Sequence, residues 1–246
     1  MKGVSCLLAI DGSAEARAAA YFAWDLAERS GAKVLAQHVI DVGAAWRYLS
    51  HNSNGFIGNG VYLQAFDSIK SSLYSISEAL LDSYKCQLDG RNIESEICVD
   101  EGDIVEEIVK RSKDHELLIV GHRDLSAAKF RMQTDGKSVA HELIMRSYCP
   151  VLLVQSLFSM PEKIQIWIND VNADPELTQR IRDWGSKLGM KVEFRSSTGE
   201  FPEEEKAVDA QQARFVLPMF MRNNPQAAHD IDDSKEERKP AMLFWS

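Results

Sequence analysis

The chain has 246 residues, 45% of them hydrophobic, and a formal net charge of −9. This length fits one large domain or two small ones, with enough apolar residues for a core. The acidic balance argues against nucleic acid as a partner, because phosphate backbones favour clustered Lys and Arg. No stretch approaches the roughly 20 apolar residues that cross a membrane, and the apolar run after Met1 is too short for a signal peptide. We therefore expect a cytoplasmic protein with no membrane partner.

In chain order, the apolar spacing predicts strand 4–10, helix 14–30, strand 32–40, helix 61–88, strand 93–99, helix 103–115, strand 116–122, helix 138–147 and strand 150–155. Ser13 and Gly31 stand where an N-cap and a helix-ending glycine belong. Strands that are unbroken apolar runs, each followed by a helix, predict an α/β domain with a doubly wound, parallel, five-stranded sheet. Ligands bind such sheets at the carboxyl ends of the strands, where strand order reverses.

Between the second strand and the long helix, residues 41–60 are rich in glycine and asparagine, which predicts irregular structure. Its aromatic residues Trp46, Tyr48 and Phe56 fit a lid over the strand ends, ordinary packing or a contact surface.

The second half is less regular, and it predicts strand 163–170, helix 174–190, strand 191–197, a short helix at 201–212, strand 213–220 and strand 240–245. The segment "LGMKVEFR" loosely repeats "SGAKVLAQ" from the first half, so we infer an internal repeat. The domains are then residues 1–156 and a second, reduced α/β copy at 157–246. Pro218 interrupts its strand 213–220 and no glycine-rich loop follows, so we expect no second nucleotide site.

The cysteines Cys6, Cys86, Cys98 and Cys149 are scattered, and no short Cys or His pair supports a metal site. The stretch "TDGKS" (134–138) ends like a P-loop, but Arg131 stands where the first glycine of that loop belongs. No residue stands out as a catalytic group, and His38 reads as a hydrogen-bonded core residue.

Five segments in order resemble the universal stress protein family: "LLAIDGS", "AQHVID", "VDEGDIVEEIV", "LLIVGHR" and "SVAHELIMRSYCPVLLVQ". The resemblance covers nearly all of residues 1–156, and tandem members of that family fit the reduced second copy. It implies a stress-response or regulatory module. It also implies self-association through the fifth strand, Pro150–Gln155, either between two chains or between the two halves of one chain.

Many members of that family bind ATP through two glycines after the fourth strand and a Gly-Ser or Gly-Thr that opens the last helix. Gly121 matches the first glycine, Asp124 replaces the second, and Lys137 and Ser138 stand at the helix start. Asp11 and Val39 match the positions at the adenine and ribose end. The resemblance thus implies a cofactor site at Ile10, Asp11, Val39, Gly121, His122, Arg123, Gly136, Lys137, Ser138 and Val139.

Two interpretations stay open at this site. Asp124 repels phosphate whereas Lys137, His122 and Arg123 attract it, so the altered loop either binds ATP or another adenine nucleotide or has lost that ability. Mg²⁺ is expected only with a triphosphate, and hydrolysis would at most be slow. Asp11 either contacts the nucleotide or only caps the next helix with Ser13. The alternative is a nucleotide-independent, dimerising interaction module; an enzyme that uses the cleft for another small ligand is a third reading.

Overall fold

The structure is a computed structural model that describes residues 4–50, 59–122, 139–156, 163–168, 175–196, 216–221 and 241–245. The first half contains β1 (Ser5–Ala9), α1 (Ala14–Ser30), β2 (Lys33–Ile40), α2 (Val42–Ser50), α3 (Asn59–Leu88), β3 (Ser95–Glu101), α4 (Ile104–Arg111), a 3-10 turn (Ser112–Asp114), β4 (Leu117–Gly121), α5 (Val139–Arg146) and β5 (Val151–Val154). Apart from α2, each of these helices and strands was predicted, with ends that differ by a few residues.

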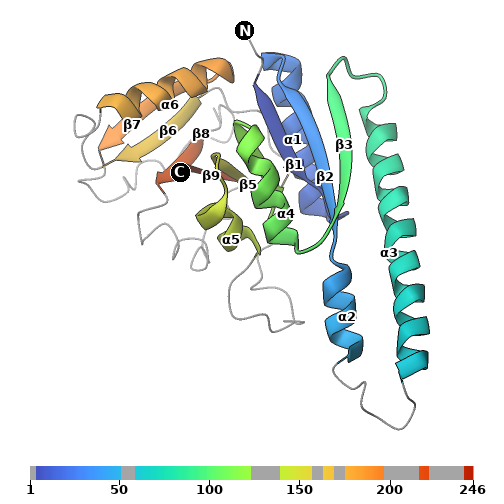
Figure 1. The fold of residues 1–246 in the computed structure, drawn as a ribbon. Coiled ribbons are helices and arrows are strands. Elements are labelled where there is room, and N and C mark those ends of the chain that lie inside the picture. The colour runs from blue at the N-terminus through green and yellow to red at the C-terminus, as the bar shows by residue number, and fades with distance from the viewer. Residues whose placement is uncertain are drawn as a thin grey trace.

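The first five strands form a parallel sheet in the order β3-β2-β1-β4-β5 (Figure 1). This order confirms the predicted five-stranded parallel sheet. The chain runs outward from β1 through β2 to β3 and then returns to β4 on the other side of β1. Strand order therefore reverses between β1 and β4, and a crevice for a ligand is expected at their carboxyl ends.

Helices cover both faces of this sheet. On one face, Ala19, Trp24 and Leu26 of α1 share a buried cluster with Leu8 of β1 and Tyr84 of α3. On the other face, a second buried cluster joins residues of α4 and α5 to the sheet; its members include Val105, Ile108, Leu118, Leu143 and Leu153. Two covered faces explain why β4 and β5 are continuous apolar runs, because neither side of these strands meets water.

Helix α1 begins and ends at the residues that the sequence predicted. The Ser13 side chain accepts a hydrogen bond from the Ala16 N–H at 3.0 Å, and Gly31 ends the helix with a left-handed φ of 69°. A left-handed φ suits glycine, which has no Cβ to clash.

The prediction of irregular structure for all of residues 41–60 is wrong, because Val42–Ser50 form α2. The Asp41 side chain accepts a hydrogen bond from the Ala44 N–H at 2.7 Å, which caps the helix start. Trp46 packs edge-on against Phe66 of α3, with ring centroids 5.1 Å apart, so α2 and the first part of α3 lie side by side (Figure 1). Trp46 therefore packs against α3 while its side chain stays partly exposed. The side chain of Tyr48 and all of Phe56 lie outside the described residues.

The second half contributes β6 (Lys163–Ile168), α6 (Pro175–Lys187), β7 (Lys191–Ser196), β8 (Val216–Met221) and β9 (Ala241–Trp245). All five lie within two to three residues of predicted positions, and Pro175 occupies the first helical position, which suits its fixed φ. The short helix predicted at 201–212 lies outside the described residues.

The two halves share one nine-stranded sheet, in which β9 joins β5 and the order continues β9-β8-β6-β7. The β5–β9 pair is antiparallel, whereas β9, β8, β6 and β7 are parallel to one another. The expectation that Pro218 interrupts its strand is wrong, since β8 runs through it. Pro218 pairs with Gln165 of β6, whereas pairing with β9 starts only at Met219. Because Pro218 has a paired strand on one side only, its missing N–H costs little.

Candidate functional site

The turn between β1 and α1 is fixed by its own side chains. The Asp11 carboxylate accepts a hydrogen bond through Oδ1 from the Ser13 N–H at 2.9 Å, and Gly12 adopts a left-handed φ of 82°. Asp11 therefore has the structural role that the sequence left open. Its side chain is exposed, and Oδ2 makes no hydrogen bond within the described part of the chain. One carboxylate oxygen remains available to a ligand.

Ile10 and His38 link the carboxyl ends of β1 and β2. The Ile10 N–H donates to the Gln37 carbonyl at 2.9 Å, and the half-buried His38 donates from Nδ1 to the Ile10 carbonyl at 2.8 Å. A carbonyl only accepts, so Nδ1 carries the proton. His38 thus holds the strand ends together, as the sequence interpretation of a hydrogen-bonded core residue predicted.

Val39 and Asp100 lie opposite each other in the β2–β3 register. Val39 is partly buried against the α4–α5 cluster, which confirms that it packs as an apolar residue. Asp100 is held by Arg111, whose Nη2 lies 2.7 Å from Oδ1, and by Gln37, whose Nε2 lies 2.7 Å from Oδ2. Burial acts to raise the pKa of Asp100, but the hydrogen bonds from Arg111 and Gln37 outweigh it and lower the pKa. Unlike Asp11, Asp100 is engaged on both oxygens.

Gly121, at the end of β4, has a packing role that the family resemblance did not reveal. A Cβ on Gly121 would lie 2.3 Å from the Ala16 nitrogen, in the first turn of α1. No side chain fits there without moving backbone. The alanine-rich start of α1 was the available signal, because small residues permit a helix to approach a strand closely.

The predicted phosphate end of the site is described only at its two borders. His122 is buried, and its backbone N–H donates to the Val154 carbonyl at 2.8 Å. Val139 is exposed and begins α5. The remaining predicted positions lie outside the described residues: Arg123, Asp124, Gly136, Lys137 and Ser138. Among the described residues, Ile10, Asp11 and His38 lie together at the carboxyl end of β1, between the ends of β2 and β4.

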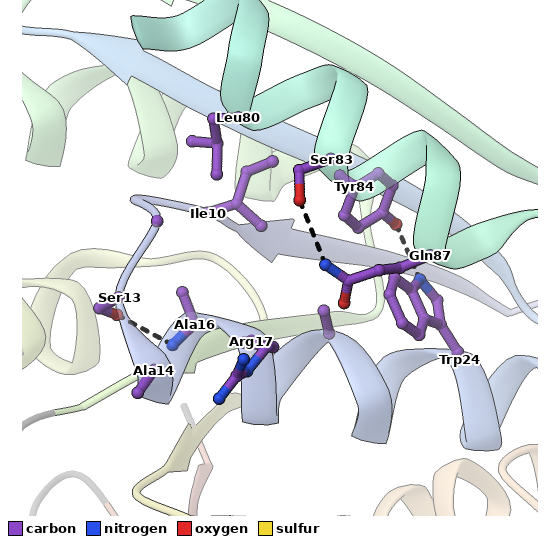
Figure 2. A pocket seen from close by; sticks show the side chains of 12 residues that line it. Ile10, Ser13, Ala14, Ala16, Arg17, Trp24, Leu80, Ser83, Tyr84 and Gln87 are labelled. Carbon is purple, nitrogen blue, oxygen red and sulfur yellow. Dashed lines mark hydrogen bonds between the residues drawn. The ribbon is translucent and has the colours of Figure 1, made fainter.

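A pocket of about 380 Å³ lies beside this edge, between α1 and α3 (Figure 2). Of the predicted site residues that the structure describes, Ile10 alone lines it. Sequence reasoning missed this pocket because its walls come from helices about 60 residues apart in the chain. Among the described residues, no cluster of His, Cys, Asp and Glu could hold a metal ion. None of the described helices is long and apolar enough to cross a membrane.

Comparison with solved structures identifies the fold. A universal stress protein from Archaeoglobus fulgidus aligns with 98% of this chain and 96% of its own, at a TM-score of 0.57 and 16% identity. The chain has a universal stress protein fold. A universal stress protein family member from Burkholderia pseudomallei aligns with 62% of this chain and 96% of its own (TM-score 0.44, 19% identity).

A third universal stress protein family member, from Arabidopsis thaliana and with AMP bound, aligns with 62% of this chain and 92% of its own (TM-score 0.43, 15% identity). No family model matches the sequence, and no curated protein sequence matches it. At these identities the universal stress protein likeness is one of fold.

Proposed function

We propose that this protein is a universal stress protein, a stress-response or regulatory module that binds an adenine nucleotide at the carboxyl ends of β1 and β4. The observation that carries the proposal is the position of Asp11. It follows β1, at the edge of the sheet where strand order reverses between β1 and β4, and its Oδ2 has no hydrogen bond within the described residues. A carboxylate oxygen in that place accepts hydrogen bonds from an adenine amino group or a ribose hydroxyl.

The proposed phosphate end comprises Gly136, Lys137 and Ser138, immediately before α5, together with His122 and Arg123 after β4. First-turn amides of a helix attract anions, and Lys137 adds a positive charge. Asp124 opposes phosphate through like-charge repulsion, so we expect affinity below that of a loop with glycine there. We expect hydrolysis to be slow at most, and Mg²⁺ would be needed only with a triphosphate.

The proposal is tested by nucleotide content and calorimetry. The protein is purified without added nucleotide and denatured, and the supernatant is chromatographed; ATP and AMP are then titrated into fresh protein. Lys137→Ala and Ser138→Ala are expected to weaken binding, and Asp124→Gly to strengthen it. Lys187→Ala, on α6 in the other half, serves as the matched lysine control. Absence of both co-purified nucleotide and binding heat, including in Asp124→Gly, would sink the proposal.

We further propose that the second half is a reduced copy of the first, as in tandem members of the family. Strand topology supports this: the order β7-β6-β8-β9 corresponds to β2-β1-β4-β5, and α6 connects β6 to β7 as α1 connects β1 to β2. The strands described in the second half include no equivalent of β3. Under this proposal, β9 pairs with β5 as the fifth strand of a partner would.

That pairing bears on the alternative, a nucleotide-independent interaction module. Because β9 covers the β5 edge, self-association of two chains through β5 would have to displace β9. The arrangement therefore favours pairing between the halves of one chain over a dimer built on Pro150–Gln155.

A further inference from the structure

The pocket between α1 and α3 has an apolar floor. Five buried residues supply it: Ile10, Ala16, Ala20, Trp24 and Tyr84. Figure 2 shows the Trp24 indole N–H directed at the Tyr84 hydroxyl, at 3.0 Å, and that hydroxyl lies 3.1 Å from the Ser95 Oγ. The polar atoms of both rings are therefore satisfied by the protein itself. A ligand on this floor meets mainly carbon.

The rim of the pocket is polar and carries one positive charge. Arg17 contributes from α1, and Ser83 and Gln87 contribute from α3, where Gln87 Nε2 donates to Ser83 Oγ at 3.2 Å (Figure 2). The 12 lining residues that the structure describes include one arginine and no carboxylate, in a protein whose net charge is −9. Arg17 is exposed and forms no ion pair within the described residues. The rim thus offers an unpaired guanidinium to an anion.

This pocket is separate from the proposed nucleotide site. Its walls are α1 and α3, which cover one face of the sheet, whereas Val39 and α5 belong to the cluster on the other face. Among the described residues, the two sites have Ile10 in common, at the β1–α1 turn. Loss of one site therefore does not require loss of the other.

We propose that the α1–α3 pocket is a second ligand site, which binds a small amphipathic carboxylate with its apolar body over Ala20 and Trp24 and its carboxylate at Arg17. Known small-molecule sites occupy about 300–1,000 Å³ and combine an apolar lining with few polar groups, and the volume of about 380 Å³ selects for small ligands. A guanidinium binds a carboxylate through two parallel N–H donors, which fixes the ligand's orientation.

The test uses 3-phenylpropionate and hexanoate as probes, and 3-phenylpropionamide as the uncharged control. The Trp24 indole N–H resonance reports occupancy and is assigned by loss of its signal in Trp24→Phe. We expect a saturable shift with a carboxylate probe and an affinity at least about tenfold lower for the amide, the effect of one charge-assisted hydrogen bond. Arg17→Ala should lower carboxylate affinity about tenfold, while Arg29→Ala, at the other end of α1, should leave it unchanged.

Ser83→Trp separates blockage of the pocket from damage to the fold. Ser83 is exposed at the rim, so the indole covers the mouth without entering the core, and we expect loss of the probe-induced shift with an unchanged circular dichroism spectrum. Lys137→Ala should leave probe affinity unchanged, which distinguishes this pocket from the nucleotide site. No saturable shift with either carboxylate, or equal affinities in wild type, Arg17→Ala and Ser83→Trp, would overturn the proposal.

Discussion

The two halves of the sheet are supported differently. In the first half, α1 and α3 cover one face of the strands and α4 and α5 cover the other. In the second half, α6 is the one helix among the described residues, and its Ile181 and Trp184 belong to the same buried cluster as α1 and β5. The first half thus has two cores, whereas the described part of the second half shares one of them.

This difference shows where the second half obtains its stability. Leu243 and Trp245 of β9 join the buried cluster that contains Leu152 of β5. Strand β9 therefore belongs to the second half of the chain but packs in a core of the first half. Burial in a shared core makes the stability of the second half depend on the first. The first of three predictions tests that dependence, and the other two compare individual packing contacts in the two halves.

The largest effect is expected at the junction. Leu243 has no solvent exposure, so Leu243→Ala should lower the free energy of unfolding by about 2–5 kcal/mol through lost burial and the cavity left behind. Limited proteolysis should then cleave residues 157–246 faster than residues 1–156. Leu63→Ala, at an exposed leucine of α3, is the control and should change little. Equal protection of both halves in Leu243→Ala would contradict the dependence.

A smaller effect is expected from one closely packed glycine in each half. A Cβ on Gly121 would lie 2.3 Å from the Ala16 backbone, whereas a Cβ on Gly185 would lie 2.3 Å from the Val192 side chain. A side chain yields more easily than backbone, and alanine favours a helix interior by about 1 kcal/mol over glycine. Gly121→Ala should therefore destabilise by about 1–3 kcal/mol, and Gly185→Ala by less. Urea unfolding of both variants measures the difference; a larger loss in Gly185→Ala would refute the argument.

The smallest effect concerns two tryptophans that pack edge-on, with ring centroids 5.1 Å apart. Trp184 Nε1 donates to the Glu116 carbonyl at 3.1 Å, whereas the buried Trp245 Nε1 has no hydrogen-bond partner within the described residues. Replacement by Phe removes a hydrogen bond only at Trp184. We expect Trp184→Phe to be the more destabilising by about 1 kcal/mol, measured by circular dichroism in urea. Equal losses would mean that this hydrogen bond contributes nothing.

The sequence predicted the first half well because its signals are local and agree with one another. The apolar run at 116–122, the Ser13 cap and the Gly31 stop each act over a few residues. The missed helix, α2, depends on Trp46 packing against Phe66, a contact that periodicity does not reveal. Likewise, which strand pairs with β5 depends on chain segments far apart, so the sequence left two partners open.

In the candidate site, too, local features could be predicted from the sequence and tertiary contacts could not. Asp11 and Ser13 could be read from their spacing, because the turn they form is local. The close approach of Gly121 to α1 and the pocket between α1 and α3 arise from tertiary packing. The residues around Lys137 stay a prediction, to be decided by nucleotide titration.

Because β5 and β9 belong to the same chain, their pairing does not depend on the protein concentration. Two separate chains that pair through an edge strand dissociate on dilution, but β9 is tethered to its partner, and its effective concentration is set by the connecting chain. The nine-stranded sheet therefore does not depend on how much protein is present. A molecule at the lowest cellular abundance keeps the same paired architecture as one in a concentrated solution.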